Sequence, residues 1–230
     1  MTRPGIGPGA LFAGGVMEKE KIIVFQGDSV TDAGRNRDQT EPNRGLGTGY
    51  PLLAAARLLA ERPHDNLQFY NRGISGNRVV DLYARWKIDT LNYKPDLISI
   101  LIGVNDTWHE YMRQNGVEVE RYAQVYRMLL GWTLEVLPEV KLVLIEPFIL
   151  PGSAPGPEWF AEMEARRAVV RELAEEYRTG FVAAQEILSA AAEETSPEYY
   201  LADGVHPTAA GHQLIADAWI REVKKRGFLS

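Results

Sequence analysis

The sequence predicts an α/β protein, a three-layer α/β/α sandwich in which helices cover both faces of a five-stranded parallel sheet. Short apolar runs alternate along the chain with longer segments of helical periodicity, and this order is typical of parallel β-α-β units. The apolar runs show no polar alternation, which indicates strands buried on both faces. The length of 230 residues, with 45% hydrophobic and 24% charged residues, fits one globular domain.

The first predicted strand is KIIVFQ (21–26), a β-branched apolar run, and the helix YPLLAAARLLAER (50–62) follows it. The other strands are expected at 66–71, 96–103, 141–148 and 180–184, and the other helices at 78–91, 118–137, 157–178 and 207–226. The run at 96–103 is the strongest strand pattern, whereas 180–184 is short enough for an edge strand. No repeat, low-complexity tract or linker divides the chain, so we expect one domain over 21–230.

Residues 1–20 precede the first predicted strand. Their apolar patch, ALFAGGV, is short, broken by glycine and preceded by one arginine, which is a poor match to a secretory signal. We therefore expect a disordered extension, with Met17 as an alternative start, and a cytoplasmic protein.

Composition excludes several classes of function. The net charge of −6, from 31 acidic and 25 basic residues, argues against a nucleic-acid partner. The absence of cysteine excludes a thiol nucleophile, a disulfide framework and thiolate metal sites. No apolar run approaches the roughly 20 residues that span a bilayer, so no membrane partner is expected. His206 and His212 lie six residues apart across a predicted helix start, and His64 lies at the end of a helix distant in sequence, so we expect no metal site.

The loops that follow the predicted strands carry the candidate chemistry, because ligands of open parallel sheets bind beyond the carboxyl ends of the strands. These loops read GDSVTDAG, RGISGN, GVNDTWH and PFILPG. The dinucleotide-like GLGTGY (45–50) follows no predicted strand, so we interpret it as a loop that opens a helix. His212 is interpreted as a packing residue of the last helix.

Ser29, directly after the first strand, is a candidate nucleophile, and its alternative role is an ordinary helix cap or turn. The segment DGVHP supplies a candidate acid and base. A residue before proline is pushed into extended backbone, so His206 should lie on a loop while Pro207 opens the last helix. Asp203 precedes His206 by one turn, and its alternative role is to brace that turn.

Two further residues are candidate oxyanion donors: the Asn105 side chain, after the third strand, and the Gly73 N–H, after the second. Donors of this kind are aimed at the oxygen on which negative charge develops. The alternative for both is simple turn geometry.

The blocks GDS, RGISG, GVND and DGVHP occur in this order, and with them the chain from about Ile22 to the last helix resembles the SGNH hydrolases of the GDSL esterase superfamily. The resemblance implies a flavodoxin-like SGNH fold and a serine esterase that needs no metal and no cofactor. It also implies assembly into homo-oligomers, as in many relatives.

The resemblance further implies a role for each candidate residue. Ser29 is the nucleophile, His206 the general base and Asp203 its partner. The oxyanion donors are the backbone N–H groups of Ser29 and Gly73 and the side chain of Asn105.

Within this superfamily, the chain is most similar to esterases that remove acetyl groups from xylo-oligosaccharides. This similarity predicts an acetylated sugar as substrate. Asp28, Trp108 and Tyr200 are candidate substrate-binding residues, because aromatic rings near the site can stack on the apolar faces of a sugar. The alternatives are packing roles for the two aromatic side chains and a hydrogen bond to its own turn for Asp28. One departure is Ala202, where some sugar esterases carry a bulky aromatic residue before the triad acid. The alternatives are a lysophospholipase or short-chain thioesterase of the same superfamily, and a non-catalytic carbohydrate-binding domain.

Overall fold

The computed structural model describes residues 19–229, so the extension predicted over 1–20 lies almost entirely outside the described residues. A five-stranded parallel sheet forms the centre of the fold, in the order β2-β1-β3-β4-β5. Its strands are β1 (Lys21–Gly27), β2 (Leu67–Asn71), β3 (Leu97–Leu101), β4 (Lys141–Ile145) and β5 (Gly180–Val182). The predicted parallel sheet and its short edge strand are therefore confirmed.

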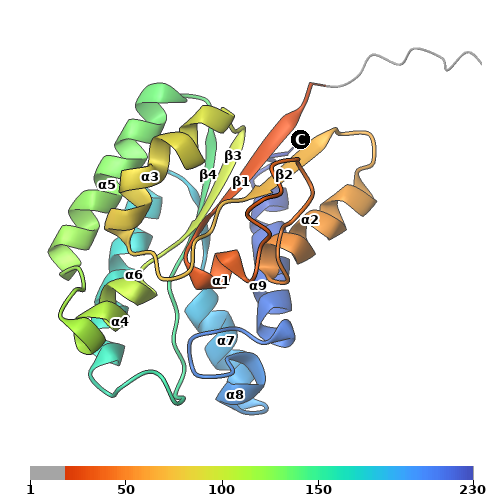
Figure 1. Cartoon of the computed structure of the whole chain (residues 1–230). Helices are drawn as coiled ribbons and strands as arrows, with labels where there is room; N and C mark the ends of the chain where they lie inside the picture. The colour runs from red at the N-terminus through yellow and green to blue at the C-terminus, as the bar shows by residue number, and fades with distance from the viewer. Residues whose placement is uncertain (1–18, 230) are drawn as a thin grey trace, which may run out of the picture.

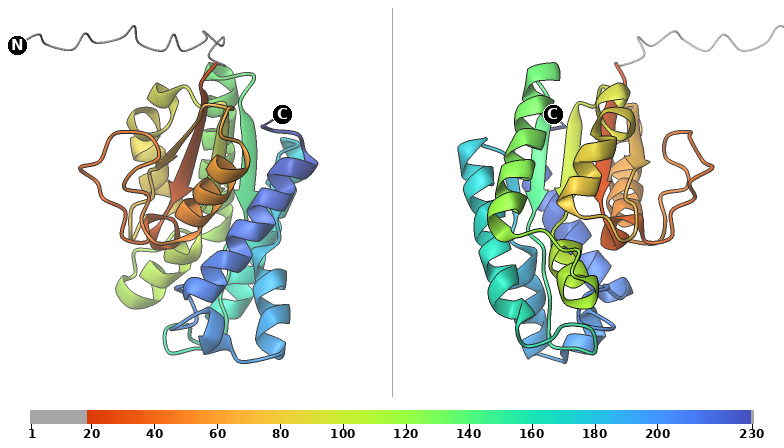
Figure 2. Two further views of the ribbon diagram at one scale, coloured as in Figure 1. Left: turned by 90° about the vertical axis from the view of Figure 1, so that its right-hand side faces the viewer. Right: turned by 60° about the vertical axis from the view of Figure 1, so that its left-hand side comes forward.

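The helices form the two outer layers of the sandwich (Figure 1). Apolar side chains of α2 (Tyr50–Glu61), α7 (Ala184–Glu193) and α9 (Ala209–Lys225) pack in one core with one face of the sheet. Those of α3 (Val79–Asp89), α5 (Val119–Val136) and α6 (Trp159–Glu176) pack in a second core with the other face. Figure 2 shows α9 running alongside α2, at a distance from α5. The predicted three-layer architecture is confirmed.

Five short elements were absent from the sequence prediction or misjudged in it. The segment after β3 was expected to be a loop but forms the helix α4 (Val104–Arg113). Three other short helices are α1 (Ser29–Asp32), η1 (Leu91–Tyr93) and α8 (Pro197–Tyr200), and α7 was also not predicted. These helices are short or carry few apolar residues, so they lack the periodicity by which helices are recognised.

The start of the last helix was also predicted wrongly. Pro207 does not open it: the proline pairs with Leu201 in an isolated antiparallel bridge. The helix begins two residues later, at Ala209, after Thr208, whose hydroxyl accepts a hydrogen bond from the Gly211 N–H. The bridge holds the DGVHP segment as a closed loop ahead of the helix, which keeps the imidazole of His206 off the helix surface.

Candidate active site

Ser29 is the first residue of α1 and follows the buried strand β1 after a single residue. That residue, Asp28, caps the helix, because its Oδ1 accepts the Val30 N–H at 3.0 Å. The cap fixes the backbone on both sides of Ser29 and leaves its N–H in the unpaired first turn of a helix. The serine hydroxyl therefore stands at the carboxyl edge of the sheet, as the sequence predicts.

The structure brings Ser29 and His206 together from opposite ends of the domain. Ser29 Oγ lies 3.0 Å from His206 Nε2, and His206 Nδ1 lies 2.7 Å from Asp203 Oδ2. A neutral imidazole whose Nδ1–H is held by a carboxylate presents a lone pair at Nε2, which can accept the serine proton. The arrangement has the geometry of an activated nucleophile.

The Asp203 carboxylate is held by three hydrogen bonds. Its Oδ1 accepts the backbone N–H groups of Val205 at 2.9 Å and of His206 at 2.7 Å, and its Oδ2 faces the imidazole. Partial burial raises the pKa of Asp203, but these hydrogen bonds outweigh that effect and hold it below its ordinary value. The group therefore stays ionised at neutral pH and favours the imidazole tautomer that carries its proton on Nδ1.

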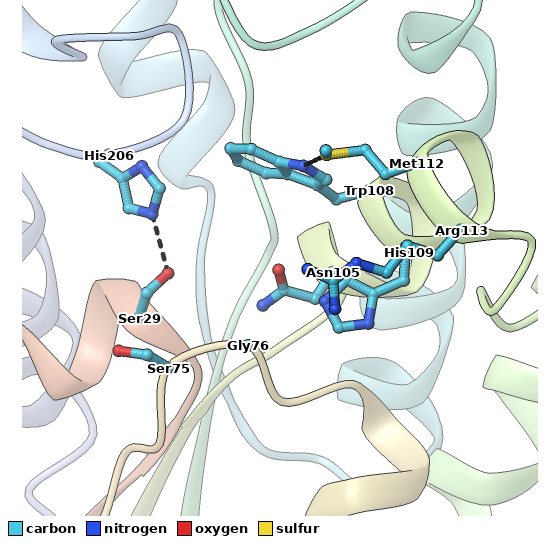
Figure 3. A pocket seen from close by; sticks show the side chains of 9 residues that line it. All are labelled: Ser29, Ser75, Gly76, Asn105, Trp108, His109, Met112, Arg113 and His206. Atoms are coloured by element: carbon cyan, nitrogen blue, oxygen red, sulfur yellow. Dashed lines mark hydrogen bonds between the residues drawn. The ribbon is translucent and has the colours of Figure 1, made fainter.

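A cavity of about 230 Å³ opens beside the Ser29–His206 pair. We name it the Asn105 cavity, and Figure 3 shows its lining: Ser29, Ser75, Gly76, Asn105, Trp108, His109, Met112, Arg113 and His206. The Asn105 side chain extends from α4 into the space opposite Ser29. One of its N–H groups bonds the carbonyl oxygen of Asn77 at 3.1 Å, which leaves the other available in the cavity.

The structure does not bring the predicted donor Gly73 into this cavity. Its N–H bonds Asn71 Oδ1 at 3.0 Å, and a Cβ at this position would lie 2.5 Å from the backbone nitrogen of Asp32. Gly73 is thus a glycine because the second loop packs tightly against α1. The glycine that lines the cavity is Gly76, whose φ of +83° favours glycine. Its N–H bonds no other residue among 19–229.

Sequence reasoning therefore chose the wrong glycine of the RGISGN loop. The signal was present, because the loop contains a second glycine beside Ser75 and Asn77. What the sequence does not reveal is that the N–H of Gly73 is already bonded to the side chain of Asn71, at the end of β2.

The three residues predicted to bind substrate differ in their placement. Trp108 lines the Asn105 cavity, and the centre of its ring lies 5.8 Å from that of His206. Its Nε1–H donates a hydrogen bond to Met112 Sδ at 2.6 Å. Tyr200, in α8, packs against the core and does not line the Asn105 cavity. Asp28 is 1% exposed, so its carboxyl lies beneath the serine, where it caps α1 and does not reach a bound molecule.

Two buried carboxyl groups lie under the site. Burial raises the pKa of Asp28 to about 7, although the Val30 N–H and the charge of His206 oppose the shift. Burial likewise raises the pKa of Asp106 to about 7, against the opposing charge of Arg166 and the Val79 N–H that Asp106 accepts. Asp106 thereby joins the start of α3 to α4, the helix that carries Asn105.

A second cavity, of about 350 Å³, shares Ser29 and His206 with the first but is otherwise lined by other elements. We name it the His212 cavity; its remaining lining is Val30, Ala33, Thr48, Pro207, Ala209 and His212. His212 is buried, as expected of a packing residue. The Ser29–His206 pair thus stands between two cavities.

Within residues 19–229, no group of three or more histidine and carboxylate side chains is arranged to hold a metal ion. Over the same range, the helices are too short or too polar to cross a bilayer.

Comparison with known proteins identifies the family. A model of the GDSL-like lipase/acylhydrolase family matches residues 25–214, which include Ser29, Asp203 and His206. The chain belongs to this family. This GDSL-like hydrolase is 39% identical, over 210 residues, to an acetylxylan esterase from Geobacillus stearothermophilus, and the match covers 89% of this chain and 94% of that protein. It is therefore a carboxylic ester hydrolase, as the sequence predicts.

Solved structures agree with this membership. A GDSL-like lipase from Parabacteroides merdae shares 42% identity with the GDSL-like hydrolase at a TM-score of 0.87, over 90% of this chain and 97% of that one. Two catalytic mutants of the Geobacillus stearothermophilus acetylxylan esterase, one with an aspartate and one with a serine replaced by alanine, are 35% and 36% identical, with TM-scores of 0.81 and 0.80. Each covers 90% of this chain and 95% of its own.

Proposed function

We propose that this protein removes acetyl groups from carbohydrate esters, such as acetylated xylo-oligosaccharides, through a Ser29–His206–Asp203 triad and an acetyl-enzyme. The observation that carries the proposal is the continuous chain of contacts from Ser29 Oγ to His206 Nε2, 3.0 Å, and from His206 Nδ1 to Asp203 Oδ2, 2.7 Å. The similarity to an acetylxylan esterase over most of the chain supports the choice of substrate.

The reaction begins when His206 Nε2 takes the proton of Ser29 as the serine oxygen attacks the ester carbonyl. Asp203 stabilises the imidazolium that results. His206 then protonates the leaving alcohol, and a water molecule activated by the same imidazole releases acetate from Ser29. Every proton in this scheme passes through one nitrogen atom, and the scheme requires no metal or cofactor.

The oxyanion of the tetrahedral intermediate is held, in this proposal, by three donors: the N–H groups of Ser29 and Gly76 and the side-chain amide of Asn105. Gly76 replaces the predicted Gly73, whose N–H is already bonded to Asn71. Donors in such positions typically contribute about 10²–10³ each in rate.

The test is acetate release from a mixture of acetylated xylo-oligosaccharides, with the wild type and Ser29→Ala compared. Loss of a triad serine is expected to lower turnover by roughly 10⁴–10⁶. Ser153→Ala, at an exposed serine outside both cavities, is the matched control and is expected to keep full activity. Wild-type protein that hydrolyses 4-nitrophenyl acetate but releases no acetate from the sugars would disprove the sugar assignment and leave the esterase assignment standing.

Acyl length separates this function from that of a lipolytic relative. An acetylesterase discriminates against longer chains by about 1–3 kcal/mol for each methylene that its pocket rejects, so rates should fall from acetyl to octanoyl esters of 4-nitrophenol. A rise along the same series would instead identify a lysophospholipase or thioesterase.

A further inference from the structure

The His212 cavity contains a second histidine that the proposed mechanism does not use. Although the ring of His212 is buried, it contributes to the wall of a cavity that also holds both reacting side chains, Ser29 and His206.

The tautomer of His212 follows from its hydrogen bond. Its Nδ1 accepts the backbone N–H of Tyr50, the first residue of α2, at 3.2 Å. The contact is close because Gly49 leaves room for the ring: a Cβ there would lie 2.8 Å from His212 Cε1. Burial, together with the charge of His206, lowers the pKa of His212 to about 4, so the ring is neutral. A neutral imidazole that accepts at Nδ1 carries its proton on Nε2.

The Nε2–H of His212 is therefore a donor without a partner. It bonds no other residue among 19–229, and it is not one of the unpaired polar side-chain atoms of this range that are fully buried. Nε2 is consequently accessible, and the accessible space beside this buried ring is the His212 cavity.

Thr48 is another polar residue of the cavity lining. Its hydroxyl donates to the carbonyl oxygen of Ala33 at 3.1 Å, which leaves the oxygen free to accept. Four other lining residues are apolar: Val30, Ala33, Pro207 and Ala209. A largely apolar lining that also offers one hydrogen-bond donor and one acceptor matches the apolar faces and hydroxyl groups of a sugar ring.

We infer that the His212 cavity binds the alcohol part of the ester, with the Nε2–H of His212 donating to one of its hydroxyl groups and Thr48 accepting from another. This inference rests on the proposed function, because it requires an alcohol that carries hydroxyl groups. It assigns the two cavities different tasks: oxyanion donors face the Asn105 cavity, and the leaving group occupies the His212 cavity, within reach of His206.

The experiment compares two substrates in one enzyme. The measured quantity is the selectivity ratio, defined as kcat/KM for a mono-O-acetylated xylobiose divided by kcat/KM for 4-nitrophenyl acetate, whose leaving group has no free hydroxyl. His212→Asn places an amide oxygen near the position of Nδ1, so the Tyr50 N–H can keep its acceptor while the donor into the cavity is lost. The selectivity ratio is expected to fall about 3- to 10-fold, the range of one neutral hydrogen bond. His64→Asn, at an exposed histidine outside both cavities, is the matched control and should not change the ratio.

Thr48→Val provides a second, independent variant. It replaces the accepting hydroxyl by a methyl group at an exposed position, and thermal unfolding checks that the variant is folded. Its selectivity ratio should also fall, mainly through a higher KM for the sugar ester.

Two outcomes would overturn the inference. The first is a selectivity ratio that stays unchanged in both folded variants, including the case in which the rates on the two substrates fall in parallel, as expected if His212 only supports α2. A changed preference for acetyl over butyryl aryl esters, with an unchanged selectivity ratio, would assign the cavity to the acyl chain instead. Failure of the proposed function is distinguishable, because the wild type itself would then release no acetate from xylobiose, and the inference would fall with it.

Discussion

At the residue scale, the two oxygens of Asp203 have different partners, and this difference predicts the effect of an amide. Oδ1 is fixed by the N–H groups of Val205 and His206, so the oxygen of an introduced asparagine would take that position. Its NH₂ group would then face His206 Nδ1, which would have to become an acceptor. The imidazole proton would move to Nε2, where it blocks transfer from Ser29.

Asp203→Asn is therefore expected to lower kcat by about 10⁴ while the fold remains intact. The measurement is the steady-state rate on 4-nitrophenyl acetate, with thermal unfolding as the control for structure. A variant that retained more than a tenth of the wild-type kcat would contradict the role of Asp203 in setting the tautomer.

Some features of single residues could be predicted from the sequence, and others could not. The positions of Ser29 and His206 were predictable, because Ser29 follows a strand end and His206 precedes a proline, whereas the roles proposed for them and for Asp203 came from the family resemblance. Gly73 and Gly76 were not distinguishable, because the difference lies in a hydrogen bond from the Gly73 N–H to the side chain of Asn71, the last residue of β2. Burial of Asp28 was equally hidden, since a residue beside a nucleophile can point toward the cavity or away from it.

At the scale of elements, Arg166 of α6 contacts α4, the segment that follows α4, and α5. Its guanidinium is fully buried, pairs with Glu162, and donates to Thr107 Oγ1 at 2.8 Å and to the carbonyl oxygen of Val117 at 2.5 Å. It also lies 5.1 Å from the centre of the Tyr122 ring. These contacts hold α6 against α4, the helix that carries Asn105.

Arg166→Met is expected to lower the free energy of unfolding by about 3–5 kcal/mol, because it leaves buried acceptors and the nearby Asp106 without a cation. Urea denaturation measures the loss, and kcat should fall as well, since α4 loses its support. Arg121→Met, at an exposed arginine that bonds Gln124, is the matched control, with an expected change below about 0.5 kcal/mol. Equal stability of the two variants would refute the role of Arg166.

The elements that the sequence predicted are those with long apolar patterns, such as β3 and α5. The helix α4 was missed because its last residues are mostly exposed and its buried first turn, from Val104 to Thr107, is mostly polar. Its polar residues are buried because they bind other loops: Asp106 accepts the N–H of Val79, and Asn105 bonds Asn77. A helix whose buried face carries functional side chains has no apolar periodicity to detect.

At the scale of the whole molecule, the buried carboxyl groups couple stability to pH. Asp28 and Asp106 both have a pKa of about 7 in the folded protein, against an ordinary value of 3.8. Because the folded-state pKa is raised, their contribution to stability is complete below about pH 4 and is lost as the pH rises through 7. Asp203, whose pKa is lowered, acts in the opposite direction, and its contribution is lost toward acid pH.

Asp106→Asn tests this coupling, because an amide cannot ionise and its oxygen can still accept the Val79 N–H. The melting temperature of the variant, relative to the wild type, is expected to rise between pH 4 and pH 8, with a gain of a few kcal/mol in unfolding free energy at pH 8. Thermal denaturation of both proteins in the same buffers measures it. Melting curves that shift in parallel across this pH range would rule out ionisation of Asp106 as a cost to stability.

The distance in sequence between Ser29 and His206, 177 residues, has a consequence for synthesis of the enzyme. Ser29, the proposed nucleophile, is made with the first strand, but His206, the proposed base, is made only when the segment before α9 is added. In this proposal, a nascent chain on the ribosome carries Ser29 without its base through nearly all of translation. Esterase activity is therefore expected only after the segment that carries His206 has been added, so its appearance would report assembly of the site.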